Sequence, residues 1–294
     1  MATAHSPIEW TDSTWNPVTG CTKVSPGCDH CYAERITTRF QGPGAFGTVT
    51  THPDRLSQPA RWRTGRRVFV NSMSDLFHPA VGLDLLAGVF AVMAGTPRHT
   101  YQILTKRPAR ARALLGGPGL EHAARDKHHA STGPAGDWRW PLPNVWLGVS
   151  VETQQWAETR VPALLATPAA LRFVSAEPLL GPVDLTPWLA SPHHHAEGHH
   201  DPDTRWVGAP IGPEPLRLLD WVITGGESGP RARPADPGWV RALRDACVTT
   251  GVPFFFKQWG GRTPKTGGRT LDGHTWQQYP TPPAGQGDGP QATA

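Results

Sequence analysis

Six short apolar segments, spread over most of the chain, constrain the fold more than any other feature of the sequence. They lie at residues 67–74, 100–105, 145–150, 171–175, 221–224 and 252–256. Most lack the apolar–polar alternation of a half-exposed strand, which is typical of strands covered on both faces. Helical patterns lie between them, at residues 83–93, 153–166 and 237–250. This alternation of strands and helices predicts an α/β fold.

Right-handed crossovers would wind these units into a full or partial parallel barrel, or into a doubly wound sheet. No Gly-x-Gly-x-x-Gly fingerprint follows the first strand, which disfavours a dinucleotide-binding fold. Polar residues gather where the predicted strands stop, and in parallel barrels the carboxyl ends of the strands build the active site. We therefore expect an enzyme. The strand-end residues include Ser74, Asp75, Lys106, Arg107, Ser150, Glu152, Glu177, Glu227 and Lys257.

Composition limits the domain organisation and the class of protein. We expect one barrel domain over residues 1–262, with insertions at about residues 116–143 and 191–215, and a flexible C-terminal tail at residues 263–294 that is rich in Gly and Pro. A charged content of 18 % excludes a coiled coil. The sequence has neither an apolar run long enough to span a membrane nor a signal peptide, so we expect a cytoplasmic protein. The net charge of +4 permits an anionic substrate without requiring one.

Three of the four cysteines lie within eleven residues, as Cys21, Cys28 and Cys31 in the spacing C-x6-C-x2-C. Thiols stay reduced in the cytoplasm, so this spacing favours a metal or iron–sulfur site over disulfides. Cys247 falls on one helical face with Val240 and Leu243, which predicts a buried helix residue rather than a ligand.

Two metal chemistries remain open at this point. A structural zinc needs four protein ligands, and no second pair with suitable spacing follows the three cysteines; His30 would complete such a site only in a tight geometry. Three thiolates on a four-iron cluster instead leave one iron open to a cofactor. The alternatives to an enzyme are a zinc-stabilised nucleic-acid-binding protein and an iron–sulfur protein that only transfers electrons or senses.

Residues 16–34, which contain the three cysteines and Tyr32, resemble the cluster loop of radical S-adenosylmethionine (radical SAM) enzymes. These enzymes usually carry C-x3-C-x2-C followed by an aromatic residue, so the first spacing departs from the pattern. Residues 74–84, 103–106, 148–150 and 173–179 resemble the spore photoproduct lyase branch of that superfamily. Over residues 5–262 the chain looks most like a phage and bacterial family of three-cysteine-motif proteins of unknown function.

The resemblance implies a partial parallel (β/α) barrel of the radical SAM type, TIM-like, with six or seven units. It implies that Cys21, Cys28 and Cys31 hold a [4Fe–4S] cluster and that S-adenosylmethionine (SAM) is the second cofactor. Tyr32 would lie near the adenine, and Ser74 would bond the methionine amino group. Lys106 and Ser150 would hold the methionine carboxylate, for which an ammonium group is well suited.

The resemblance also implies a mechanism. A reduced cluster passes one electron into the sulfonium, and the products are methionine and a 5′-deoxyadenosyl radical that takes hydrogen from a substrate over the barrel mouth. The implied partners are a one-electron donor of the flavodoxin or ferredoxin type and a nucleic-acid substrate. Glu177, Glu227 and Lys257 are the candidate catalytic residues for substrate binding or proton transfer, with salt bridges at the barrel rim as the alternative.

Overall fold

A computed structural model describes residues 6, 8–133, 138–189, 199–201, 204–207, 218–263 and 266–281. Its main sheet has seven strands, and each adjacent pair is parallel. In spatial order they are β1 (Ser13–Trp15), β4 (Arg67–Val70), β5 (Thr100–Thr105), β6 (Val145–Ser150), β7 (Leu171–Ala176), β10 (Trp221–Thr224) and β11 (Phe254–Phe256).

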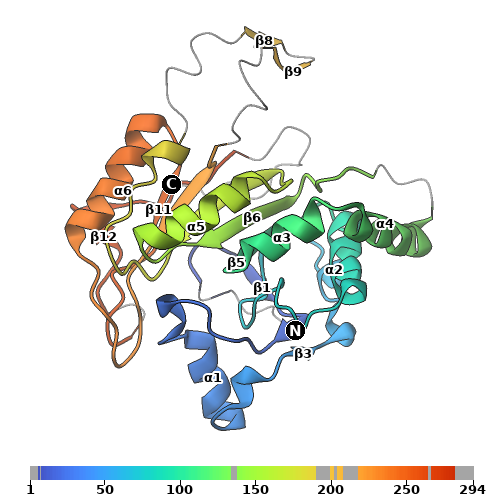
Figure 1. Ribbon diagram of the computed structural model, residues 1–294, viewed down its shortest axis with the longest axis horizontal. Coiled ribbons are helices and arrows are strands. Elements are labelled where there is room, and N and C mark those ends of the chain that lie inside the picture. Colours follow the sequence, from blue (N-terminus) through green and yellow to red (C-terminus); the bar gives the residue numbers. More distant parts are fainter. Residues whose placement is uncertain are drawn as a thin grey trace.

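The spatial order of the strands follows their order in the chain without reversal. A doubly wound sheet reverses its order at a switch point. The sheet is therefore a half-barrel of an α/β protein, compatible with a partial TIM-like barrel (Figure 1). The six predicted strands are confirmed as β4 to β7, β10 and β11, whereas the three-residue β1 carries too short a pattern to be predicted.

Helices connect most successive strands, although the described residues between β7 and β10 contain no α-helix. The main helices are α1 (Tyr32–Gln41), α2 (Leu83–Gly95), α3 (Pro108–Leu115), α4 (Pro118–Thr132), α5 (Gln154–Leu165) and α6 (Pro237–Thr250). Helices α2 to α6 lie on the outer side of the sheet, whereas α1 lies apart from them (Figure 1). The predicted helices are confirmed as α2, α5 and α6. In the described ranges, no helix is long and apolar enough to cross a membrane.

Short elements complete the described chain. They are the two-stranded pairs β2 (Val18–Thr19) with β3 (Thr50–Thr51), β8 (His199–Asp201) with β9 (Thr204–Val207) and β12 (Thr270–Leu271) with β13 (His274–Thr275), and the 3₁₀ turns η1 (Pro26–Cys28), η2 (Ala45–Gly47), η3 (Pro53–Arg55), η4 (Pro59–Arg61) and η5 (Thr186–Trp188).

The inner side of the half-barrel is closed by aromatic side chains. Its core comprises Trp10, Phe69, Trp146, Leu171, Phe173, Trp221, Ile223 and Phe255. Gly148 makes room for this packing, because a Cβ there would come within 2.4 Å of the Phe173 ring. We call this cluster the aromatic floor; the carboxyl-end residues of the same strands lie above it.

Two segments that the sequence sets apart from the barrel contain regular structure. The first insertion is largely helical: α4 buries Leu120, Ala124 and His128, which are four residues apart and so share one helix face. These few apolar positions lie among many polar residues, which obscures the helical pattern. Part of the predicted tail is also folded, because Gln277 pairs with Phe255 and extends the edge of the sheet. The second insertion lies mostly outside the described residues, as do residues 282–294.

Candidate functional site

A cavity of about 1010 Å³ lies at the carboxyl ends of the strands. It is bounded by the aromatic floor, by α1 and by residues 21–31, which we call the cysteine segment. Its wall contains all ten of the site residues that the sequence suggests. They are Cys21, Cys28, Cys31, Tyr32, Ser74, Lys106, Ser150, Glu177, Glu227 and Lys257.

Strand periodicity explains how residues so distant in sequence share one cavity. Side chains two apart on a strand face the same side, so the inner face that carries Leu104 at the floor also carries Lys106 two residues later. The same step places Ser175 and Glu177 above Phe173 on β7. Because parallel strands end at the same edge of the sheet, their terminal polar residues converge there.

The three thiols line this cavity from the connection between β2 and α1. Cys28 ends the turn η1, and Cys31 is the N-cap residue of α1. Burial raises the pKa of Cys21 and of Cys31, and the neighbouring Cys28 raises both further. All three thiols therefore line the same cavity.

Within the described part of the chain, no three His, Cys, Asp or Glu side chains converge closely enough to hold a single metal ion. A mononuclear zinc site draws its ligands to one point. A four-iron cluster binds each thiolate through a different iron, so its ligands need not meet. The three thiols in the cavity wall supply the sulfur donors that an iron–sulfur cluster uses.

A first ion pair fastens the segment at Cys21. Arg107 lies 3.0 Å from the Oδ2 carboxylate oxygen of Asp75, and its guanidinium donates to the carbonyl and the hydroxyl of Thr22 at 2.9 and 3.0 Å. The same guanidinium lies 3.5 Å from the Sγ atom of Cys21. Asp75 is itself held by the Thr105 hydroxyl at 2.8 Å.

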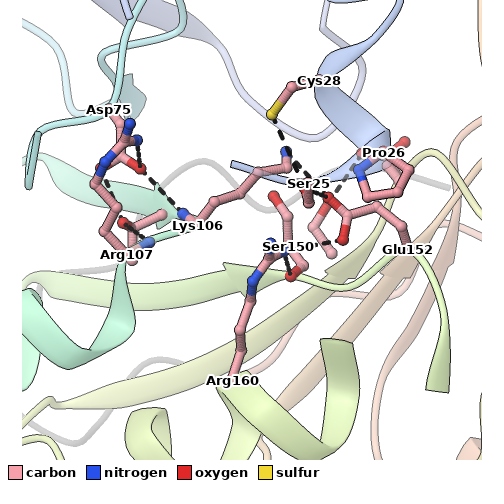
Figure 2. Close-up of polar contacts among 12 residues, drawn as sticks. Ser25, Pro26, Cys28, Asp75, Lys106, Arg107, Ser150, Glu152 and Arg160 are labelled. Atoms are coloured by element: carbon pink, nitrogen blue, oxygen red, sulfur yellow. Dashed lines mark hydrogen bonds and ion pairs between the residues drawn. The ribbon is translucent and has the colours of Figure 1, made fainter. Parts of the chain in front are cut away.

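A second ion pair fastens the segment near Cys28 (Figure 2). The Glu152 side chain is fully buried, and its Oε2 atom accepts a hydrogen bond from Arg160 at 2.9 Å. Its Oε1 atom accepts one from Ser25 at 2.7 Å and lies 3.6 Å from the ammonium of Lys106. The Ser25 hydroxyl is also 3.9 Å from the Sγ atom of Cys28.

A third ion pair lies beside Cys31. Glu227 accepts hydrogen bonds from His30 at 2.8 Å and from three nitrogen atoms of Arg233 at 2.5 to 3.0 Å. Burial alone would raise the pKa of Glu227, but the hydrogen bonds from Arg233 and His30 outweigh it and lower the pKa to about 2. Arg233 also donates to the carbonyl of Pro26 at 2.9 Å. Glu227 is therefore an ionised partner of the cysteine segment.

The candidate SAM-binding residues lie along the cavity wall and differ in whether other protein groups already bind their side chains. Ser74 donates its hydroxyl to the Val18 carbonyl at 2.8 Å, and Tyr32 donates to the carbonyl of Ser72. Lys106 keeps 21 % of its side chain exposed, although it lies beside a fully buried carboxylate.

Glu177 and Lys257 form an ion pair in the cavity wall. The Lys257 ammonium lies 3.4 Å from Oε1 of Glu177, and the Ser175 hydroxyl donates to Oε2 at 3.2 Å. An ammonium beside a carboxylate can hold a polar ligand or pass a proton to it. These two candidates therefore meet, whereas Glu227 lies with the cysteine segment.

Arg107 and Glu152 belong to the polar strand ends seen in the sequence, but no role was predicted for them, and Arg160 and Arg233 were not predicted as site residues. The position of Arg160 in the sequence could have indicated a buried ion pair, because it falls on the α5 face that buries Ala157, Val161 and Leu164. A charged residue within a buried stripe requires a charged partner. Arg233 gives no such signal. The prediction for Cys247 is confirmed: it is fully buried on α6, and burial raises its pKa to about 12.

No curated protein matches the chain. Among solved structures, a mutant of spore photoproduct lyase is similar at 14 % identity and a TM-score of 0.37, over 60 % of this chain and 48 % of that one. The chain thus spans about half the length of that structure. A family model described as "Protein of unknown function (DUF5131)" matches residues 5–280, so the chain belongs to that family.

Proposed function

We propose that the protein is a radical SAM enzyme that cleaves SAM reductively at a [4Fe–4S] cluster and abstracts hydrogen from a substrate. One observation carries the proposal: three thiols that are close in sequence share a cavity with the polar strand ends of a parallel half-barrel. Cys21, Cys28 and Cys31 would hold the cluster. When bound, cluster and SAM together supply a one-electron reduction of the sulfonium and a carbon radical.

The roles of the cavity residues follow from their contacts. The Lys106 ammonium can bind the methionine carboxylate, with Ser150 of β6 in the same cavity wall, because charge-assisted hydrogen bonds are about twice as strong as neutral ones. Ser74 retains acceptor capacity for the methionine amino group, since its hydrogen is donated to Val18. Tyr32 offers an aromatic ring for the adenine. The aromatic floor excludes water below.

Glu177 and Lys257 are assigned to the substrate. Both lie in the cavity, and their mutual contact keeps a proton donor and an acceptor together. Glu227 is assigned instead to positioning, because Arg233 and His30 occupy both of its oxygen atoms and hold it ionised. An ionised carboxylate with a pKa of about 2 does not donate a proton at neutral pH.

The surface beside the cavity favours a nucleic-acid component as substrate. Four of the six large apolar side chains exposed in the described ranges are Val24, Tyr32, Ile36 and Phe40, on the cysteine segment and α1. Arg35 and Arg39 lie on the same helix and also line the cavity. Aromatic rings interleaved with arginines are the means by which proteins bind single-stranded nucleic acid.

The cofactor assignment is tested by anaerobic purification. We expect a brown protein with about four irons per chain and a broad absorption band near about 400 nm. Incubation with dithionite and SAM should yield 5′-deoxyadenosine, with the reductant replacing a flavodoxin or ferredoxin type of donor. Cys28→Ala should abolish the colour, whereas the matched variant Cys247→Ala should keep it.

Other outcomes of this experiment identify the competing functions. A colourless protein with one zinc per chain would refute the enzyme proposal in favour of a zinc-stabilised binder. A four-iron protein that forms no 5′-deoxyadenosine would be a carrier of electrons or a sensor.

The substrate assignment is tested with a fluorescent single-stranded oligonucleotide and fluorescence anisotropy at several salt concentrations. Replacing Arg35 and Arg39 with Ala should weaken binding and reduce the slope of log K against log salt by about 1.4, about 0.7 per lost phosphate contact. Arg112→Ala, an exposed residue of α3, is the control. Equal affinity of all three proteins would refute the assignment.

A further inference from the structure

We propose that Arg107 and Glu152 are positioning residues that fix the segment between Cys21 and Cys28, and thereby the distance between these two thiols. We call residues 22–27 the spacer. The inference rests on the proposed function, because the distance matters when both thiols bind one cluster. It concerns residues to which that function assigns no contact with SAM or substrate.

The spacer has regular structure only at its end, where Pro26 and Gly27 belong to the turn η1. Residues 21–24 form no helix or strand, and the side chains of Thr22, Lys23 and Val24 are exposed. Fixing the backbone of one residue costs about 1–2 kcal/mol of conformational entropy. Six residues between two ligands therefore need external contacts before the thiols can lie at a defined distance.

Arg107 supplies such contacts at the start of the spacer. Only 10 % of its side chain is exposed, and its ion pair with Asp75 fixes its orientation. One nitrogen of its planar fork donates to both oxygens of Thr22, and the other lies 3.5 Å from the Sγ atom of Cys21. A guanidinium can hold backbone, hydroxyl and sulfur at once, because its five donors lie in a rigid plane.

Glu152 supplies the contacts at the end of the spacer. Its carboxylate is fully buried, kept in place by Arg160, and accepts the hydroxyl hydrogen of Ser25. Gly27 packs directly against it: a Cβ on Gly27 would come within 2.4 Å of the Oε1 atom. The carboxylate therefore touches both the side chain and the backbone of the spacer, one residue before Cys28.

The test uses the full chain in its metal-free form and in its iron-loaded form. In the metal-free chain, a short bifunctional thiol reagent joins Cys21 to Cys28 when the two thiols are close. Trypsin cuts after Lys23, so this crosslink joins two peptides that mass spectrometry can quantify. In the iron-loaded chain, iron per chain and the midpoint potential of the cluster are measured.

We expect Arg107→Gln and Glu152→Gln each to lower the crosslink yield and the iron content several-fold. Arg112→Gln and Glu158→Gln, which change exposed residues of α3 and α5, are the matched controls. Ser25→Ala removes only the hydroxyl contact and leaves the buried ion pair, so it should lower the yield without unfolding the chain. Circular dichroism monitors the fold of every variant.

Arg107→Lys separates charge from geometry. It keeps a positive charge beside Cys21 but loses the planar guanidinium. The midpoint potential of Arg107→Gln should shift to a more negative value, whereas that of Arg107→Lys should stay closer to the potential of the parent. Unchanged crosslink yields in folded Ser25→Ala and Arg107→Gln would overturn the inference. A chain that binds no iron, yet loses its crosslink in these variants, would refute the cluster and leave the positioning role intact.

Discussion

The buried ion pair between Glu152 and Arg160 makes a quantitative prediction about stability. Replacing Arg160 with Met keeps an apolar chain over the Trp156 ring, which the guanidinium now covers at 4.2 Å. The change leaves the carboxylate of Glu152 buried without its main partner. Removing one member of a buried pair costs about 3–5 kcal/mol, because the remaining charge is uncompensated.

The contacts of Glu152 place the expected loss at the lower end of this range. Its Oε1 atom still receives the Ser25 hydroxyl at 2.7 Å and lies 3.6 Å from the Lys106 ammonium. We therefore expect Arg160→Met to lower the free energy of unfolding by about 3 kcal/mol. At about 2–4 °C per kcal/mol for a domain of this size, the melting temperature should fall by about 6–12 °C.

A double-mutant cycle checks this reasoning. Urea unfolding gives the free energy for the parent, Arg160→Met, Glu152→Gln and the double variant. The double variant should be more stable than Arg160→Met alone, since it no longer buries an unpaired charge. The control Glu158→Gln, on the exposed side of the same helix, should stay within about 0.5 kcal/mol of the parent. A loss below about 1 kcal/mol for Arg160→Met, or strict additivity in the cycle, would refute the reasoning.

Three further predictions concern other parts of the structure. Gly148→Ala should destabilise the protein by about 1–3 kcal/mol in urea unfolding, because its Cβ would overlap the Phe173 ring. Glu227→Gln should lower the melting temperature at neutral pH. Since the folded pKa of Glu227, about 2, lies below its ordinary 4.5, its contribution is complete above pH 4.5, and the difference from the parent should shrink as the pH falls from 4.5 towards 2. Cys247 should resist alkylation in the folded metal-free chain, because it is buried and its pKa is raised to about 12, whereas the three cavity thiols should react, as peptide mapping will show.

Each of these predictions has a control or a contradicting result. Gly119→Ala, where the added Cβ meets nothing within 4 Å, should not destabilise α4, so equal losses at both glycines would contradict the packing argument. A melting-temperature difference for Glu227→Gln that stays constant between pH 4.5 and 2 would contradict the ion-pair argument. Alkylation of Cys247 as fast as that of the cavity thiols would contradict its burial.

Local patterns in the sequence determined the secondary structure of much of this protein and the burial of individual residues. The predicted apolar strands place Lys106 and Glu177 at strand ends, and the repeat of 3.6 in α6 gives the burial of Cys247. The strand ends and the burial of Cys247 both depend on residues that are close in sequence, so they can be predicted from the sequence alone. The spacing of Cys21, Cys28 and Cys31 likewise brings three thiols into one segment without reference to the rest of the chain.

Only the tertiary structure decided what holds that segment in place. Ser25 and Glu152 are 127 positions apart in the sequence, yet they share a hydrogen bond of 2.7 Å. No local pattern encodes such a pair, because its partners meet only after the crossovers have brought the ends of β4 to β7 to one edge of the sheet. The same holds for Arg107, whose charge lies beside Cys21 through long-range packing. The sequence confined the candidate functional residues to a few short segments. The fold brought to the cysteine segment the charged side chains that hold it in place.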